Sequence, residues 1–113
     1  MPKDDWIYIK HMLEMSEKAI DAIRGKDRQI YNNDLTLQMG LAHFIQIIGE
    51  AARRVSPDFQ SAHPEILWRQ IIGTRHRIVH DYMNIDEDVV WKIVEDDLPN
   101  LVGSLKILIN TGL

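Results

Sequence analysis

The stretch that decides the fold is residues 35–55, LTLQMGLAHFIQIIGEAARRV. Its apolar residues recur at helical spacing and form a stripe that is much wider than one narrow seam. The stripe consists of Leu37, Leu41, Phe44, Ile45, Ile47, Ile48, Ala51, Ala52 and Val55. A helix that is apolar on two sides usually lies at the centre of a bundle or is shared with another subunit. Gly40 and Gly49 each cost this helix about 1 kcal/mol against alanine, so we expect another helix to approach closely there.

The segments next to the central helix are simpler. Residues 5–24 show apolar residues at helical spacing and predict an amphipathic helix. A polar connector over residues 26–33 leads from it to a helix cap at Asn33 or Asp34. After the central helix we expect a short loop over residues 57–63.

The second half of the chain predicts two further helices. One covers residues 64–82, because proline and then glutamate suit its first turn. The other begins at a cap on Asn84 or Asp86 and runs to about Asn110, with a kink or break at Pro99. The pattern as a whole predicts an all-α, antiparallel bundle of four to five helices.

Composition limits the class of protein. The 113 residues suffice for one hydrophobic core, so we expect a single domain over residues 1–113. The absence of cysteine excludes a disulfide framework and a thiolate metal site, and it fits a reducing cytoplasm. The longest uncharged run, residues 35–49, falls short of the roughly 20 apolar residues that span a bilayer. A net charge of −4 argues against a general nucleic-acid coat protein, although a local basic site remains open. We therefore expect a soluble, cytoplasmic protein without a membrane partner.

The reactive side chains gather in one stretch, Arg75-His76-Arg77-Ile78-Val79-His80-Asp81-Tyr82. On an ideal helix over residues 64–82, Arg75 falls in the middle of the apolar face together with Tyr82. His80 then points well away from both. Either the helix is irregular near Gly73-Thr74, or a second subunit completes the site.

Three interpretations of this stretch are open. In a purely structural one, Arg75 is buried and paired with an acid such as Glu50, while His76 and His80 are solvated. In a metal site, His76 and His80 are suitably spaced, but the neighbouring arginines oppose a cation, and we expect no metal. In RNA cleavage, a histidine moves the proton of a 2′-hydroxyl and an arginine stabilises the phosphate, while Tyr82 orients phosphate or base. That reaction needs no cofactor.

Arg75, His80 and Tyr82 also match a known pattern. Their spacing, R-x4-H-x-Y, resembles the motif of HEPN proteins, and in particular of the HepT-type ribonuclease toxins. Four more segments resemble that family, in the family's order: residues 48–52 (IGEAA), 64–68 (PEILW), 80–82 (HDY) and 85–91 (IDEDVVW). The resemblance covers essentially the whole chain.

The resemblance implies a HEPN-like homodimer whose two motifs line a cleft at the interface. It implies metal-independent cleavage of RNA, with transfer-RNA ends among the targets. Arg75, His80 and Tyr82 are then the catalytic residues, with His76 and Arg77 in support. It also implies a cognate antitoxin, the MntA-like nucleotidyltransferase, which transfers AMP to Tyr82. The family commonly has asparagine where this chain has His76.

An alternative from another class is a non-catalytic helical partner or substrate of a small nucleotidyltransferase. The net negative charge and His76 motivate it. A structural dimer module without any chemistry is the third possibility. Cleavage of RNA by the purified protein distinguishes the ribonuclease from both.

Overall fold

The computed structural model describes residues 3–81 and 84–112, which form an all-α bundle with one small β-hairpin. This confirms the predicted fold class. The helices are α1 (Lys3–Ala22), α2 (Arg28–Asn32), α3 (Leu35–Arg54), α4 (Pro57–Ala62), α5 (Trp68–Ile72), α6 (Thr74–Ile78), α7 (Glu87–Lys92), the π-helical turn η1 (Ile93–Asp97) and α8 (Leu98–Gly112). The strands are β1 (Val79–Asp81) and β2 (Asn84–Ile85).

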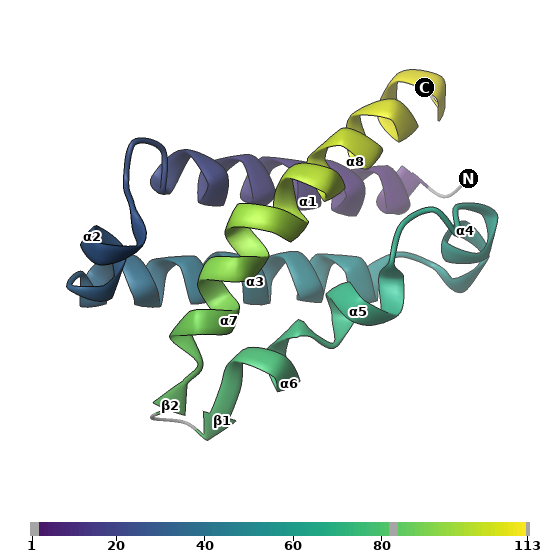
Figure 1. Cartoon of the computed structure of the whole chain (residues 1–113). Helices are drawn as coiled ribbons and strands as arrows, with labels where there is room; N and C mark the ends of the chain where they lie inside the picture. Colours follow the sequence, from purple (N-terminus) through teal and green to yellow (C-terminus); the bar gives the residue numbers. More distant parts are fainter. Residues whose placement is uncertain (1–2, 82–83, 113) are drawn as a thin grey trace.

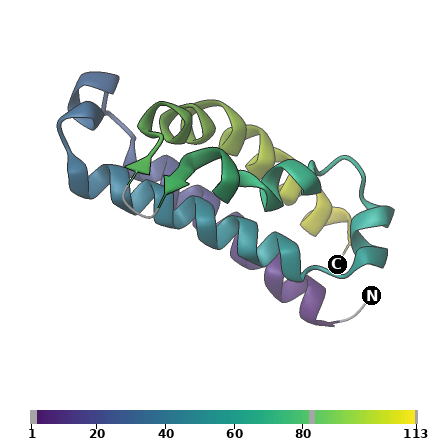
Figure 2. The ribbon, with the colours of Figure 1, turned by 90° about the horizontal axis from the view of Figure 1, so that it is seen from below.

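The long helices make the framework. α1 and α3 lie side by side, and the continuous rod α7–η1–α8 crosses them (Figure 1). Seen from below, α5 and α6 lie along α3, between it and the rod (Figure 2). The central helix predicted from residues 35–55 is therefore confirmed as the element that the others share. Buried side chains of all three long segments fill the core, among them Ile9, Met12, Leu41, Ile45, Val94 and Leu105.

Aspartate side chains cap several helices, and Asp34 and Asp86 are among the caps that the sequence predicted. The Asp34 carboxylate accepts a hydrogen bond from the Leu37 amide at 2.9 Å and caps α3. Asp27 caps α2 by accepting from the Ile30 amide at 2.9 Å, so the polar connector contains a helical turn of its own. At the start of α7 the cap is Asp86.

The predicted loop over residues 57–63 is wrong, because most of it forms the helix α4. Pro57 ends one helix and also begins the next, where its missing N–H costs nothing. Ser56 caps α4 by accepting from the Phe59 amide at 3.2 Å. The buried carboxylate of Asp5 in turn accepts from the Ser56 amide at 2.8 Å and from its hydroxyl at 2.7 Å. The start of α4 is thus tied to α1.

The predicted continuous helix over residues 64–82 is also wrong. It is replaced by α5, a break at Gly73, α6 and the strand β1. β1 pairs with β2 in antiparallel fashion, with Val79 opposite Ile85. The irregularity expected near Gly73-Thr74 is confirmed.

Gly49 shows why α5 and α6 can lie so close to α3. A Cβ atom on Gly49 would come within 2.9 Å of the Ile71 carbonyl oxygen and 3.2 Å of the Thr74 hydroxyl. Real Cβ atoms do not approach a backbone oxygen so closely, so only glycine allows this packing. The close approach expected at Gly49 is confirmed, whereas Gly40 faces open space.

Pro99 shapes the last rod without ending it. The rod continues from α7 to α8, and the irregular part is the π-helical turn η1 just before the proline. Because Pro99 lacks an amide hydrogen and its ring crowds the preceding turn, a wider turn there relieves the clash. The kink or break expected at Pro99 takes this form.

Candidate active site

The stretch that carries the candidate catalytic residues is held by short elements. α5 and α6 each have five residues, and neither has a side-chain cap. Thr74 anchors the junction because its side chain is buried and its hydroxyl donates to the Ile71 carbonyl oxygen at 2.7 Å. Ile78, which is fully buried, anchors the other end of α6. The polar residues between and beyond these anchors are left on the surface.

Arg75 is exposed, which contradicts the projection onto an ideal helix. The projection failed because the break at Gly73 resets the helical phase between α5 and α6. The structural alternative, a buried Arg75 paired with Glu50, is wrong for the same reason. Glu50 is paired instead with Arg53 at 2.5 Å and with Arg54 at 3.3 Å.

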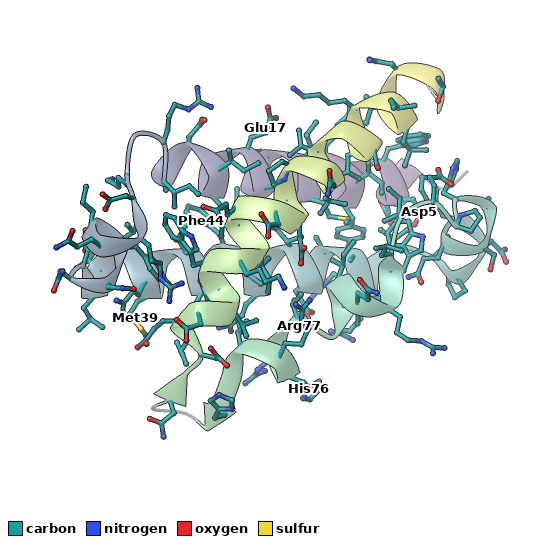
Figure 3. The ribbon with its side chains drawn as sticks, viewed as in Figure 1. Asp5, Glu17, Met39, Phe44, His76 and Arg77 are labelled. Carbon is teal, nitrogen blue, oxygen red and sulfur yellow. The ribbon has the colours of Figure 1, made fainter. Side chains whose placement is uncertain are left out.

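The remaining residues of the stretch separate in space. His76 is exposed and projects away from the bundle, whereas Arg77 points back toward the rod (Figure 3). Arg77 forms an ion pair of 3.8 Å with Asp97 of η1. His80 lies on β1 with an exposed side chain. Tyr82 lies outside the described residues.

Arg75 and His76 line an open groove of about 1150 Å³ between α3 and the α5–α6 segment. The other charged or titratable side chains of the groove are His43, Glu50, Arg53 and Arg69. Two hydrogen bonds from Arg53, at 2.5 and 3.2 Å, lower the pKa of Glu50. The Glu50 carboxylate therefore stays ionised, and the charge of Arg53 balances its negative charge. Within the described residues Arg69 and Arg75 form no ion pair. The groove therefore presents positive charge on an acidic protein, which suits a phosphate backbone.

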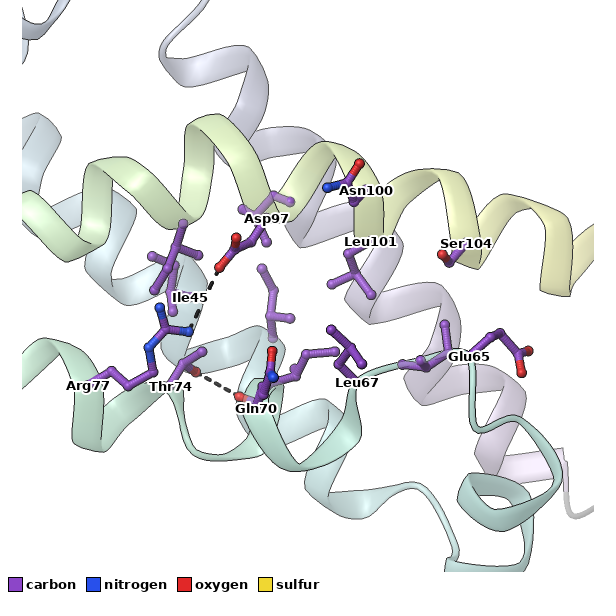
Figure 4. A pocket seen from close by; sticks show the side chains of 15 residues that line it. Ile45, Glu65, Leu67, Gln70, Thr74, Arg77, Asp97, Asn100, Leu101 and Ser104 are labelled. Carbon is purple, nitrogen blue, oxygen red and sulfur yellow. Dashed lines mark hydrogen bonds and ion pairs between the residues drawn. The ribbon is translucent and has the colours of Figure 1, made fainter.

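A second, smaller pocket of about 270 Å³ lies between the α5–α6 segment and the rod (Figure 4). Its floor is apolar and includes Ile45, Ile71 and Leu101. The ion pair between Arg77 and Asp97 bridges α6 and η1 beside it. In this structure Arg77 therefore links the site segment to the rod and does not line the groove of Arg75.

His80 has one charged neighbour that the sequence did not indicate. Its Nε2 atom lies 3.4 Å from Oδ2 of Asp86, which is the cap of α7. The hairpin brings the two residues together by reversing the chain between them. His80 is not among the described residues that line the groove of Arg75. Arg75 and His80 are both exposed, and in one copy of the chain only Arg75 of the two lines this groove.

Sequence reasoning left a local basic site open but did not place Arg53 and Arg69 in it, and it missed the role of the hairpin. Arg53 and Arg69 join Arg75 in one groove only because α5 packs on the last turns of α3. Asp86 was predicted as a helix cap, but its contact with His80 depends on β1 and β2. Among the residues that the structure describes, no group of three or more histidine or acidic side chains gathers in a way that could hold a metal ion.

An all-α bundle that exposes Arg75 and His80, in the spacing R-x4-H, is the HEPN-like class of fold that the sequence predicted. The sequence model of the family described as "Ribonuclease HepT-like" matches residues 12–107. The chain belongs to the HepT-like ribonuclease family.

Relatives from several organisms agree with this assignment. The chain is 35% identical over 103 residues to "Probable ribonuclease HepT" of Thermococcus cleftensis, covering 88% of this chain and 94% of that protein. It is 27% identical to "Putative RNase MJ1380" of Methanocaldococcus jannaschii, covering 94% of this chain and 97% of that protein. It is 25% identical to "Putative RNase TTE0752" of Caldanaerobacter subterraneus, with 88% of each chain covered. No solved structure gives a significant match. Within residues 3–81 and 84–112, no helix is long and apolar enough to cross a membrane.

Proposed function

We propose that this protein is the metal-independent ribonuclease toxin of a two-gene toxin–antitoxin module. The observation that carries the proposal is the exposure of Arg75 and His80, in the spacing of the family motif, on a member of a ribonuclease family. An exposed guanidinium in a basic groove can bind a phosphate, and an exposed imidazole can reach a 2′-hydroxyl. RNA, including transfer RNA, is the substrate class that this chemistry fits.

The reaction uses the substrate's own nucleophile. The 2′-oxygen attacks the adjacent phosphorus while the bond from phosphorus to the 5′-oxygen breaks, which leaves a 2′,3′-cyclic phosphate and a 5′-hydroxyl. His80 of one copy takes the proton of the 2′-hydroxyl. His80 of a second copy gives a proton to the departing 5′-oxygen. Arg75 stabilises the negative charge that develops on the phosphate oxygens.

In this proposal a second copy completes the site, because His80 is not among the residues that line the groove of Arg75. A surface on α2 and α3 suits self-association: Ile30, Leu35 and Met39 are apolar and exposed by 46%, 70% and 49%. Leu35, Met39 and His43 follow each other at helical spacing, and His43 already lines the groove of Arg75. A symmetric contact through this stripe places the two grooves next to each other.

The dimer is tested by light scattering after size-exclusion chromatography. The double variant Leu35→Glu, Met39→Glu is expected to be monomeric and to lose RNA cleavage. Ile107→Glu is the matched control, because Ile107 is 67% exposed on α8, away from the stripe. If the double variant remains a dimer, the proposed interface is wrong.

The antitoxin of this module is an MntA-like nucleotidyltransferase that inactivates the toxin at Tyr82. The transfer forms a bond between the Tyr82 oxygen and the α-phosphorus of ATP and releases pyrophosphate. Added negative charge beside the motif repels the RNA phosphate. Mass spectrometry of the toxin co-expressed with its neighbouring nucleotidyltransferase is expected to find AMP on Tyr82, and Tyr82→Phe is expected to remain unmodified.

Cleavage of total RNA by the purified protein tests the main proposal. The parent is expected to cut RNA equally well with and without a chelator. Arg75→Ala is expected to lower the rate by about 100-fold or more. Arg24→Ala is the matched control, because Arg24 is exposed and pairs with its neighbour Asp21 at 2.6 Å. Intact RNA with every variant would favour a non-catalytic partner protein, and a chelator-sensitive rate would favour a metal enzyme.

A further inference from the structure

Asp86 has more contacts than a helix cap needs. Its backbone amide donates to the Ile78 carbonyl oxygen at 2.7 Å, which fixes it to the buried end of α6. Its Oδ1 atom accepts from the Val89 amide at 3.1 Å, which fixes it to the first turn of α7. Both contacts leave the Oδ2 atom unused. That oxygen lies 3.4 Å from Nε2 of His80.

We infer that Asp86 is the positioning residue that orients the His80 imidazole for RNA cleavage. This inference rests on the proposed ribonuclease function. Asp86 is half-buried and held at two points, whereas His80 is 62% exposed on a short strand. The carboxylate is therefore the fixed partner, and the imidazole is the one that it orients.

The contact determines which ring nitrogen does the chemistry. In the neutral imidazole one nitrogen carries hydrogen and the other has a free lone pair. Nε2 lies 3.4 Å from a carboxylate oxygen, which can accept a hydrogen but has none to donate, so the contact favours the tautomer with hydrogen on Nε2 and the lone pair on Nδ1. Nδ1 is then the atom that takes the proton of the 2′-hydroxyl.

The same carboxylate performs two separable tasks, which makes a clean test possible. Asn at position 86 keeps an oxygen that can accept from the Val89 amide, so the cap of α7 remains. It replaces the oxygen that faces His80 with an amide group and removes the charge. Asp86→Asn should therefore affect the orientation of His80 and spare the helix.

Asp34→Asn is the matched control. Asp34 caps α3 by the same geometry, with its Oδ1 atom 2.9 Å from the Leu37 amide nitrogen. It forms no ion pair with a histidine within residues 3–81 and 84–112. Any loss that is common to both variants reports on capping, and a loss confined to Asp86→Asn reports on His80.

The first measurement is steady-state cleavage of a labelled RNA. Asp86→Asn is expected to lower kcat by about 10- to 100-fold, with KM and Tm close to those of the parent. Asp34→Asn is expected to leave kcat unchanged. Asp86→Ala loses the cap as well and is expected to lower both kcat and Tm. If kcat of Asp86→Asn equals that of the parent, Asp86 has no positioning role.

The second measurement needs no RNA and no activity. Long-range ¹H–¹⁵N NMR of the histidine ring identifies which nitrogen carries hydrogen. In the parent at alkaline pH, His80 is expected to carry it on Nε2, and Asp86→Asn is expected to lose this preference. A parent with hydrogen on Nδ1 overturns the inference even if RNA is cut. A parent with the expected tautomer that cuts no RNA overturns the proposed function instead.

Discussion

The three long helical segments differ from the stretch from α5 to β2 in burial, in element length and in the exposure of charged side chains. α1, α3 and the rod α7–η1–α8 bury most of their apolar residues in one core. The stretch from α5 to β2 has short elements, lacks side-chain caps on its two helices, and exposes its arginines and histidines. It is attached by a few buried side chains, chiefly Trp68, Thr74 and Ile78. Stability and chemistry are therefore largely carried by different parts of one small chain.

The largest expected effect is on chemistry alone. His80→Ala should lower RNA cleavage by about 100- to 10,000-fold, because the group that moves the proton is gone. The free energy of unfolding should change by less than about 0.5 kcal/mol, since the side chain is exposed. Cleavage assays and urea unfolding of the same preparation check both values. A variant that cuts RNA like the parent shows that His80 is not catalytic.

The next effect is on stability alone. Leu105→Ala should destabilise the protein by about 2–5 kcal/mol, because Leu105 is fully buried on α8 and leaves a cavity. Ile107→Ala, also on α8 but 67% exposed, should cost less than about 0.5 kcal/mol. Below the unfolding transition, Leu105→Ala should still cut RNA. Equal losses for the two variants would contradict the placement of the core.

An alkaline pH should lower the free energy of unfolding through Tyr31 of α2. The Tyr31 ring packs against the Trp91 ring at a tilt of 43°, with the ring centroids 4.9 Å apart, and its hydroxyl donates to the Glu87 carbonyl oxygen at 2.8 Å. Burial, with the nearby Glu87 carboxylate, raises the pKa of Tyr31 to about 12. An unfolded tyrosine titrates near 10, so the unfolded chain releases this proton first as the pH rises.

The stabilising effect of Tyr31 is therefore complete below about pH 10 and is lost between about pH 10 and pH 12. It amounts to about 2 kcal/mol. Urea unfolding of the parent and of Tyr31→Phe at a series of pH values measures it. The parent should lose more stability than Tyr31→Phe over this interval. Identical pH dependence would contradict the raised pKa of Tyr31.

The smallest effect lies where the framework meets the site. Gly49→Ala places a Cβ atom 2.9 Å from the Ile71 carbonyl oxygen, so α5 and α6 must move. Overpacking of this kind outweighs the gain in helix propensity. We expect the free energy of unfolding to fall by about 1 kcal/mol and RNA cleavage to be reduced.

Gly40→Ala is the internal control for Gly49→Ala. Gly40 lies on the same helix, and nothing lies within 4 Å of its added Cβ atom. Gly40→Ala should raise the free energy of unfolding by about 0.5–1 kcal/mol and retain RNA cleavage. Thermal unfolding and cleavage rates distinguish the two. If Gly49→Ala is also stabilised and active, the site segment does not depend on the close approach to α3.

The long helices could be predicted because their evidence is local. The apolar stripe of residues 35–55 repeats over several turns, and Asp34 marks its start. Short elements carry less local evidence. Pro57 is equally compatible with the end of one helix and the beginning of the next. Ser56 caps the second helix, but its position depends on the hydrogen bond with Asp5, which is distant in the sequence.

The candidate site was predictable in its residue types but not in its geometry. Arg75 and His80 were recognisable from spacing, yet a projection onto a regular helix placed Arg75 on the wrong face. Five residues of α6 are too few for periodicity to reveal a change of phase at Gly73. The proximity of His80 and Asp86 depends on a hairpin of very short strands, which the sequence does not distinguish from a helix end.

The sequence alone determined that three long amphipathic segments must pack together, because each one repeats its apolar residues at the helical period over many turns. It also determined which side chains can move a proton or bind a phosphate. Only the tertiary structure decided where those side chains lie. The glycine at position 49 lets α5 and α6 rest on α3, the break at Gly73 leaves Arg75 exposed, and the hairpin sets His80 against Asp86. Such contacts join residues through backbone turns and close packing, which no local periodicity encodes.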